Sequence, residues 1–168
     1  MDRVLDIACG TGALALALAE KAVHVTGIDL NEESIAAARM SARRRGTSNV
    51  LFEVRDASDL SCYGDNSFDV ALTSMAVHQF DADLAIKILS EMKRIAYRVV
   101  VVDYNHHMPG GWGRRVAWGI ERVAGGDHYR NFRVYMKKGG MHYFAREAGI
   151  RVKSGVLRGG GVFVVIKG

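Results

Sequence analysis

The sequence predicts a doubly wound α/β fold. Its first thirty residues read in order as a strand, a glycine turn, a helix, a second strand and an acid, which is how a strand–helix–strand unit of such a fold begins. The apolar run Arg3–Ala8 is the first strand, and Gly10 and Gly12 follow it where the backbone must turn. An Ala- and Leu-rich helix, Ala13–Lys21, then leads to the second strand, Val25–Asp29.

The rest of the chain continues this alternation. We expect strands at Val50–Arg55, Phe68–Thr73 and Arg98–Tyr104, and helices at Glu32–Arg45, Asp81–Ala96 and Trp112–Val123. A further helix passes through Tyr135 and Ala145, is interrupted near Gly139, and ends at Gly149. Two last strands, Ile150–Leu157 and Val162–Ile166, pair across the glycines between them.

The composition indicates one globular domain. The chain has 168 residues, 49% of them hydrophobic, so we expect a single domain over residues 1–168 with its own core. It has no apolar run of about 18 residues, and its N-terminus lacks the apolar segment of a signal peptide. Cys9 and Cys62 show neither disulfide nor metal-ligand spacing, and we interpret Cys9 as a buried filler. We therefore expect a cytoplasmic protein.

Gly10, Gly12 and Asp29 predict a site for a cofactor that contains adenosine, because an acid about 20 residues after such glycines holds the ribose hydroxyls. The spacing Gly10-x-Gly12-x-x-Ala15 also satisfies the dinucleotide pattern, so the glycines alone do not separate the cofactors. Asp6 distinguishes the two cofactors. A carboxylate at the end of the first strand repels a pyrophosphate and attracts an ammonium or sulfonium group. The charge favours S-adenosylmethionine over a nicotinamide dinucleotide.

Three segments resemble motifs of class I S-adenosylmethionine-dependent methyltransferases. Val4–Gly12 resembles the first motif, with Ala8 where the family commonly has glycine. Phe52–Ala57 is similar to the segment whose acid meets the adenine amino group, and Ser67–Leu72 is similar to the fourth strand. In order and spacing the three cover about the first half of the chain.

This resemblance implies a Rossmann-like fold with a mostly parallel, seven-stranded sheet whose last strand is antiparallel. It also implies a cofactor site at the carboxyl ends of the strands. The residues assigned to S-adenosylmethionine are Asp6, Ala8, Gly10, Gly12, Asp29, Leu30, Asp56, Ala57 and Ser74. Asp56 is preferred to Asp59 because it directly follows the third strand.

The segment after the fourth strand excludes several classes of methyltransferase. It lacks the Pro-Pro-aromatic signature of adenine and glutamine methyltransferases, and the chain has one proline, Pro109. It also lacks the Pro-Cys pair that attacks cytosine and the glutamate pair of protein arginine methyltransferases. What remains resembles the broad small-molecule branch, which includes quinone-type methyltransferases. The resemblance implies methyl transfer to an oxygen, nitrogen or carbon atom of a small-molecule acceptor.

Three histidines are candidate catalytic residues. His78 follows the fourth strand and His106 follows the fifth. His128 lies in a polar group after a glycine pair, a common setting for substrate contacts, with a surface loop as the alternative. Each can accept a proton from an oxygen or nitrogen acceptor, although His78 is equally explained as a packed ring. Two other functions stay open: a nicotinamide-dependent oxidoreductase, and a cofactor-binding protein without catalysis.

We expect no metal site. His106 and His107 are adjacent, and neighbours at a strand end point to opposite faces, so these two side chains would not easily chelate one ion. A catechol-type magnesium site needs an acid after the fourth strand, where this chain has Ser74 and Met75.

Residues 105–135 are the expected substrate-covering segment. Within it Trp112, Val116, Ile120 and Val123 share one helical face, with arginines opposite. We rank a lid over the active site first, an ordinary helix second, and a helix resting on a membrane surface third. The sequence begins directly on its first strand, so a later segment, a partner chain or a missing piece must supply the cover that N-terminal helices give in this family.

Charged residues are unevenly distributed along the chain, and their distribution indicates possible binding partners. Residues 1–98 hold 11 Lys and Arg against 14 Asp and Glu, and residues 99–168 hold 12 against 4. The basic half would attract an anionic small molecule, an anionic membrane surface or nucleic acid, with a solvated basic face as the equal alternative. Nucleic acid is disfavoured, because Arg43, Arg44 and Arg45 are explained by the dipole of the helix that they end. A homodimer stays open.

Overall fold

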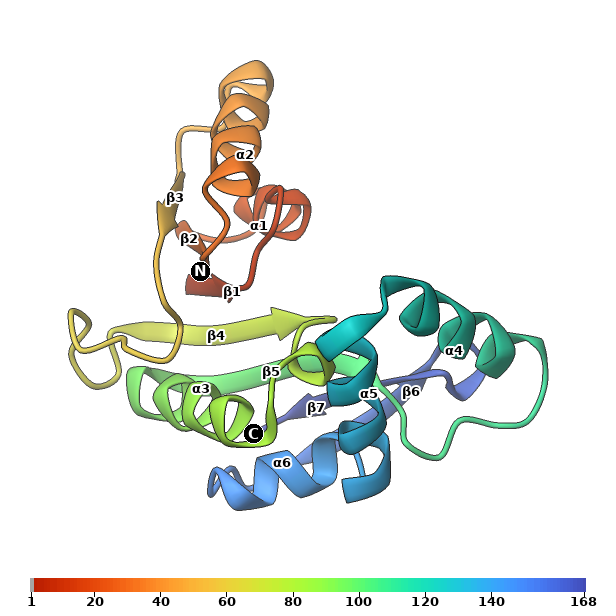
Figure 1. The fold of residues 1–168 in the computed structure, drawn as a ribbon. Coiled ribbons are helices and arrows are strands. Elements are labelled where there is room, and N and C mark those ends of the chain that lie inside the picture. Colours follow the sequence, from red (N-terminus) through yellow and green to blue (C-terminus); the bar gives the residue numbers. More distant parts are fainter. Residues whose placement is uncertain (1) are drawn as a thin grey trace. The chain divides into compact units, whose positions relative to one another are not determined.

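The computed structural model describes residues 2–168 as strands alternating with helices (Figure 1). The strands are β1 (Arg3–Ile7), β2 (His24–Asp29), β3 (Val50–Val54), β4 (Phe68–Ser74), β5 (Ala96–Tyr104), β6 (Ser154–Arg158) and β7 (Phe163–Lys167). The α-helices are α1 (Ala13–Ala19), α2 (Glu32–Arg45), α3 (Ala82–Ile95), α4 (Trp112–Ala124), α5 (Gly126–Lys138) and α6 (Met141–Glu147). Two short 3₁₀ helices are η1 (Val77–Gln79) and η2 (Gly159–Gly161).

The strand order confirms the predicted fold class. It is β3-β2-β1-β4-β5-β7-β6, with β1 parallel to both β2 and β4, and β2 parallel to β3. β7 runs antiparallel to β5 and to β6, as expected of the last strand. The hairpin is shorter than predicted, because its first strand begins at Ser154 and not at Ile150. The chain divides into two compact units, residues 1–73 with 91–99, and residues 74–90 with 100–168.

In the first unit, α1 and α2 contact β2 and β3 (Figure 1). Phe52 on β3 is 2% exposed, and its ring lies so close to Gly12 and Gly27 that a Cβ at either position would come within 2.5 Å and 2.6 Å of it. The two glycines therefore allow α1, β2 and β3 to approach closely, as the third glycine does in related folds.

The predicted bounds of α2 are confirmed, since local signals define both of its ends. The side chain of Asn31 accepts a hydrogen bond of 2.7 Å from the main-chain N–H of Ser34. Gly46 ends the helix in the left-handed conformation with a φ of 66°. Cations in the last turn complement the carbonyl end of the helix dipole.

In the second unit, α5 contacts both η1 and α4. Phe132, Tyr135 and Phe144, from α5 and α6, are at most 1% exposed and form its core. The surface-loop alternative for His128 is wrong, because the residue lies on α5. Gly125, with a positive φ of 69°, separates α4 from α5 and lets α5 begin at Gly126. Within residues 2–168, no helix combines the length and the apolar composition that crossing a bilayer requires.

A glycine substitution tests the close packing of the first unit. Gly27→Ala should lower the free energy of unfolding by about 1–3 kcal/mol, because the new methyl group would overlap the Phe52 ring. Gly119→Ala is the matched control: nothing lies within 4 Å of that position on α4, so it should raise stability by up to about 1 kcal/mol. Urea unfolding measures both, and a Gly27→Ala protein as stable as the wild type would contradict the packing argument.

Candidate active site

The turn between β1 and α1 has an unusual backbone. Ala8, Gly10 and Gly12 all lie in the left-handed region, with φ values of 56°, 53° and 78°. Glycine adopts this conformation freely, but an alanine there costs roughly 1 kcal/mol. Such strain persists where the surrounding structure imposes it, and it gathers at functional sites. The predicted cofactor turn therefore has the shaped backbone that a close ligand approach requires.

Asp29, at the end of β2, fixes this turn. Its Oδ2 accepts a hydrogen bond of 2.8 Å from the main-chain N–H of Gly10, and its Oδ1 accepts one of 2.9 Å from that of Asn31. The carboxylate thus joins the glycine turn to the start of the next loop. Leu30, the following residue, is 67% exposed. Asp29 and Gly10 are therefore brought together, and the roles of Asp29, Leu30 and Gly10 in cofactor binding stay predictions.

Asp6 is a buried carboxyl group with an unused oxygen. Its side chain on β1 is 2% exposed, and its Oδ2 has no hydrogen-bond partner among the described residues. Burial raises the pKa of Asp6 to about 7; the main-chain N–H of Ala15 opposes this rise and the nearby Asp29 adds to it. Buried polar atoms are almost always paired, so this one indicates the place of a missing partner. Thr73 Oγ1, at the end of β4, is buried and unpaired as well.

Asp56 and Ala57 follow β3, and Ser74 is the last residue of β4. Asp56 is exposed, and its Oδ1 accepts a hydrogen bond of 2.8 Å from the main-chain N–H of Ser58, so its position is defined by a local turn. Cys9 lies in the glycine turn, and burial raises the pKa of its thiol to about 12, with Asp6 and Asp29 adding to the rise. It therefore stays a neutral thiol, which agrees with its interpretation as a filler.

His78, in the second unit, belongs to a buried polar cluster. Its Nδ1 lies 2.7 Å from Asp103 Oδ1, and its Nε2 lies 3.4 Å from Glu121 Oε1. The Tyr104 hydroxyl donates a hydrogen bond of 3.0 Å to the same Glu121 oxygen. Burial is the main cause of the raised pKa of the Tyr104 hydroxyl, and this hydrogen bond is the second. His128 Nε2 lies 3.6 Å from Glu121 Oε2. Two of the three candidate catalytic histidines thus meet around one glutamate.

Glu121 is the residue that sequence reasoning missed. It lies on α4, which buries Ala117 and Glu121, whereas Trp112, Ile120 and Val123 are 79%, 57% and 88% exposed. A single acid on an otherwise basic helix was the available signal. The helix itself is confirmed, and its role as a substrate cover stays a prediction.

His106 belongs to a different cluster. Its ring centroid is 3.9 Å from that of His107 and 6.1 Å from that of His142. The expectation that His106 and His107 point to opposite faces is wrong, because β5 ends at Tyr104 and the alternation of a strand no longer applies. Burial is the main cause of the lowered pKa of His106, and the two neighbouring histidines lower it further.

His106 also lines a basic pocket of about 660 Å³ in the second unit. This basic pocket is formed by His106, Arg114, Trp118, Gly126, Tyr129, Arg130, Arg133, Val134, Met136 and Lys137. Its volume falls in the range of small-molecule sites, and its lining includes four cationic side chains and no acid. The arrangement suits a small ligand with negative charge.

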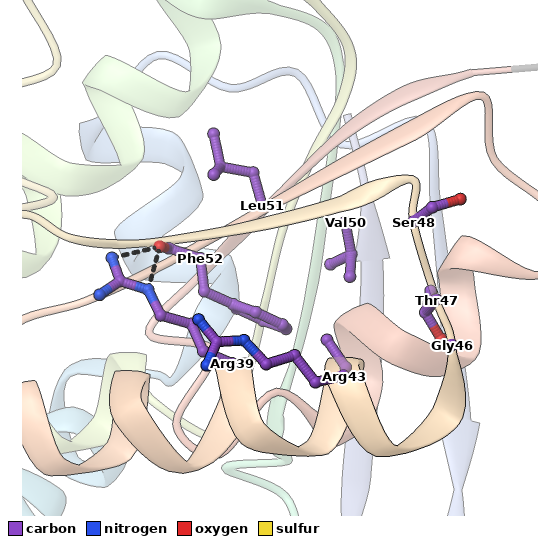
Figure 2. A pocket seen from close by; sticks show the side chains of 9 residues that line it. Arg39, Arg43, Gly46, Thr47, Ser48, Val50, Leu51 and Phe52 are labelled. Atoms are coloured by element: carbon purple, nitrogen blue, oxygen red, sulfur yellow. Dashed lines mark hydrogen bonds between the residues drawn. The ribbon is translucent and has the colours of Figure 1, made fainter.

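A second hollow lies in the first unit, along the C-terminal half of α2 and the start of β3 (Figure 2). There the Arg39 guanidinium donates hydrogen bonds of 3.0 Å and 2.7 Å to the main-chain carbonyl of Phe52. None of the predicted site residues lines this hollow. Arg39 therefore supports the edge strand, and the hollow has no part in the candidate active site.

Comparisons with known proteins show the family to which the chain belongs. A family model described as a methyltransferase domain matches residues 1–139. The chain is 32% identical over 108 residues to the uncharacterized methyltransferase YcgJ of Bacillus subtilis, covering 64% of this chain and 42% of that protein. It is 29% identical over 163 residues to the ubiquinone biosynthesis O-methyltransferase of Xanthomonas euvesicatoria, covering 92% of this chain and 66% of that protein.

Solved structures show the same fold. A protein of Pyrococcus horikoshii aligns with a TM-score of 0.75 at 21% identity, and a SAM dependent methyltransferase from Aquifex aeolicus aligns with a TM-score of 0.68 at 20% identity. Each alignment covers 99% of this chain and 80% of the other. Because the family model matches most of the residues, the chain belongs to the methyltransferase domain family, within the class I S-adenosylmethionine-dependent methyltransferases.

Proposed function

We propose that the chain transfers a methyl group from S-adenosylmethionine to a small-molecule acceptor that carries negative charge. The observation that supports the cofactor most directly is the buried, unpaired oxygen of Asp6 beside a strained glycine turn. A carboxylate at this point favours a ligand with an ammonium or sulfonium group. A dinucleotide would instead bring its pyrophosphate toward Asp6, so the oxidoreductase alternative is disfavoured on charge.

The residues of the first unit fit the proposed cofactor. Asp29 would accept hydrogen bonds from the ribose hydroxyls, Asp6 would face the cationic end, and Gly10, where nothing lies within 4 Å of a Cβ position, leaves the backbone open to close approach. Asp56 would meet the adenine amino group, as the family resemblance implies. The cofactor supplies a methyl group that is already activated for displacement. The chain must therefore position the acceptor, exclude water and take up a proton where the acceptor loses one.

The basic pocket supports the choice of an anionic acceptor. Its cations are Arg114, Arg130, Arg133 and Lys137, and Asp127 pairs with Arg130 from outside the lining. His106 lines the same pocket, and its lowered pKa keeps the ring neutral near pH 7, so that it can accept a proton. We therefore propose His106 as the proton acceptor for an oxygen or nitrogen nucleophile. His78 is 1% exposed and would need a rearrangement to touch an acceptor.

A cytoplasmic location forms part of the proposal. Both cysteines are free thiols in the structure, and Cys62 is exposed. Exposed free thiols suit a reducing compartment.

Substitution of Asp29 tests the cofactor site. Asp29→Ala should weaken S-adenosylmethionine binding by more than tenfold, because charge-assisted hydrogen bonds contribute roughly 1.5–3 kcal/mol each and the Gly10 turn loses its acceptor. Asp29→Asn keeps the shape without the charge and should give an intermediate loss. Isothermal titration calorimetry measures both variants.

Glu33→Ala is the matched control for Asp29, since it removes a nearby exposed acid from the first turn of α2 and should leave the affinity unchanged. A folded Asp29→Ala protein that binds the cofactor as tightly as the wild type would mean that Asp29 does not hold the ribose.

A matched pair of acceptors tests the acceptor class. With a hydroxylated aromatic acid and its uncharged methyl ester as candidate acceptors, transfer of the methyl group should favour the acid. Arg133→Gln should raise the KM for the acid several-fold by removing a cation from the basic pocket, whereas His106→Gln should mainly lower kcat. Radiolabelled methyl incorporation measures these parameters.

The control for Arg133 is Arg151→Gln, which removes an exposed cation outside the basic pocket and should change neither parameter. Equal rates with acid and ester, together with an unchanged KM in Arg133→Gln, would contradict the proposal of an anionic acceptor.

A further inference from the structure

His78, Glu121 and His128 form a three-residue cluster, here called the His-Glu-His cluster, within the second unit. They come from η1, α4 and α5, and α5 contacts both of the other elements. One potential ligand atom from each residue lies within 4.8 Å of those of the other two. Two imidazole nitrogens and a carboxylate thus surround one small volume.

Two atoms of this cluster are buried without partners. Glu121 Oε2 and His128 Nε2 are enclosed, lie 3.6 Å apart, and have no hydrogen-bond partner among residues 2–168. That separation is too long for a hydrogen bond between them. Leaving two such atoms buried and unpaired lowers stability. Both unpaired atoms face the same place, which is where a bound ion would satisfy them together.

Neighbouring residues orient the side chains of His78 and Glu121 for binding an ion. Asp103 Oδ1 lies 2.7 Å from Nδ1 of His78 and also accepts the main-chain N–H of Tyr104 at 2.6 Å. A carboxylate at Nδ1 favours the tautomer with its proton on that nitrogen, which leaves the Nε2 lone pair directed toward Glu121. Histidines that bind metals are oriented by carboxylates in this way. The Tyr104 hydroxyl orients Glu121 by donating to its Oε1.

The distances also suit a metal ion. Ligand atoms about 2.1 Å from a tetrahedral ion lie roughly 3.4 Å from one another. Glu121 Oε1 lies 3.4 Å from His78 Nε2, Glu121 Oε2 lies 3.6 Å from His128 Nε2, and one ligand atom from each residue lies within 4.8 Å of the others. Asp103 and Glu121 bring two acids into a region where their side chains are at most 4% exposed, and a cation would offset that buried negative charge.

We propose that His78, Glu121 and His128 bind one divalent transition-metal ion of the zinc or iron(II) class. Two imidazoles and one carboxylate match these ions, whereas magnesium and calcium prefer ligand sets made of oxygen atoms. The side chain of His128 is 31% exposed, whereas those of His78 and Glu121 are at most 4% exposed, so His128 forms the outer side of the site. The sequence did not indicate this site because its residues lie on three separate elements.

Metal titration tests this proposal without cofactor or acceptor, so its result is independent of methyl transfer. The protein is prepared without a histidine tag, stripped with a chelator, and carries Cys62→Ser, since that exposed thiol could itself bind zinc. Calorimetry should find one equivalent of Zn²⁺ bound and no binding of Mg²⁺ at the same concentration. Co²⁺ should bind in the same ratio and give the visible absorption of a site of low coordination number.

His128→Gln and Glu121→Gln should each weaken the affinity for Zn²⁺ by tenfold or more. His142→Gln is the matched control, because it removes an exposed histidine from α6 outside the His-Glu-His cluster and should leave the affinity unchanged. Circular dichroism shows which variants are folded, and His128, as the partly exposed ligand, is the substitution that the fold should tolerate best. Absence of Zn²⁺ and Co²⁺ binding, or full affinity in folded His128→Gln, would overturn the proposal.

Discussion

The hydrogen bond from Gly10 to Asp29 is the interaction on which the first unit depends. It joins the turn after β1 to the end of β2 and so fixes a loop whose backbone is left-handed at three positions. Behind it, the Phe52 ring fills the space that side chains at Gly12 and Gly27 would need. The carboxylate that would bind the ribose therefore also holds the turn, which couples the stability of the turn to the identity of the cofactor.

Each unit buries a carboxyl group with an oxygen that has no partner among the described residues. In the first unit it is Asp6, beside the glycine turn, and in the second it is Glu121, between two histidines. A buried unpaired acid lowers stability, so its presence needs a compensating ligand or role. The two acids indicate two different cations: the charged end of S-adenosylmethionine for Asp6, and a metal ion for Glu121. Both assignments follow from the same principle of charge compensation.

Much of the fold could be predicted because its signals are local. The ends of α2 follow from Asn31 and Gly46, and the first strand and turn follow from an apolar run and two glycines. The relation of Asp29 to Gly10 was also predictable, since the spacing between them is characteristic of the unit that contains them. The start of α5 could not be predicted, because Gly125 and Gly126 resemble a flexible loop in sequence but form a tight turn between two helices.

The His-Glu-His cluster could not be predicted from the sequence for a different reason. Its acid and its histidines have no characteristic spacing, and the acid that orients His78 lies on β5. Glu121 also contradicts the apolar periodicity of α4, which would place Ile120 and Val123 inside, whereas both are exposed. Tertiary packing decided which face of the helix is buried, and local hydrophobicity did not.

The central claim is that the buried carboxyl group of Asp6 selects a cofactor with positive charge. Because the pKa of Asp6 is raised to about 7, the group is neutral below that pH and negative above it. The affinity for S-adenosylmethionine, measured by calorimetry, should therefore rise between about pH 6 and about pH 8 in the wild type and stay nearly constant in Asp6→Asn. At about pH 8, where Asp6 is negative, the wild type should bind S-adenosylmethionine more tightly than NAD, and Asp6→Asn should reduce this preference. A wild-type affinity independent of pH, or tighter binding of NAD than of S-adenosylmethionine, would contradict the account.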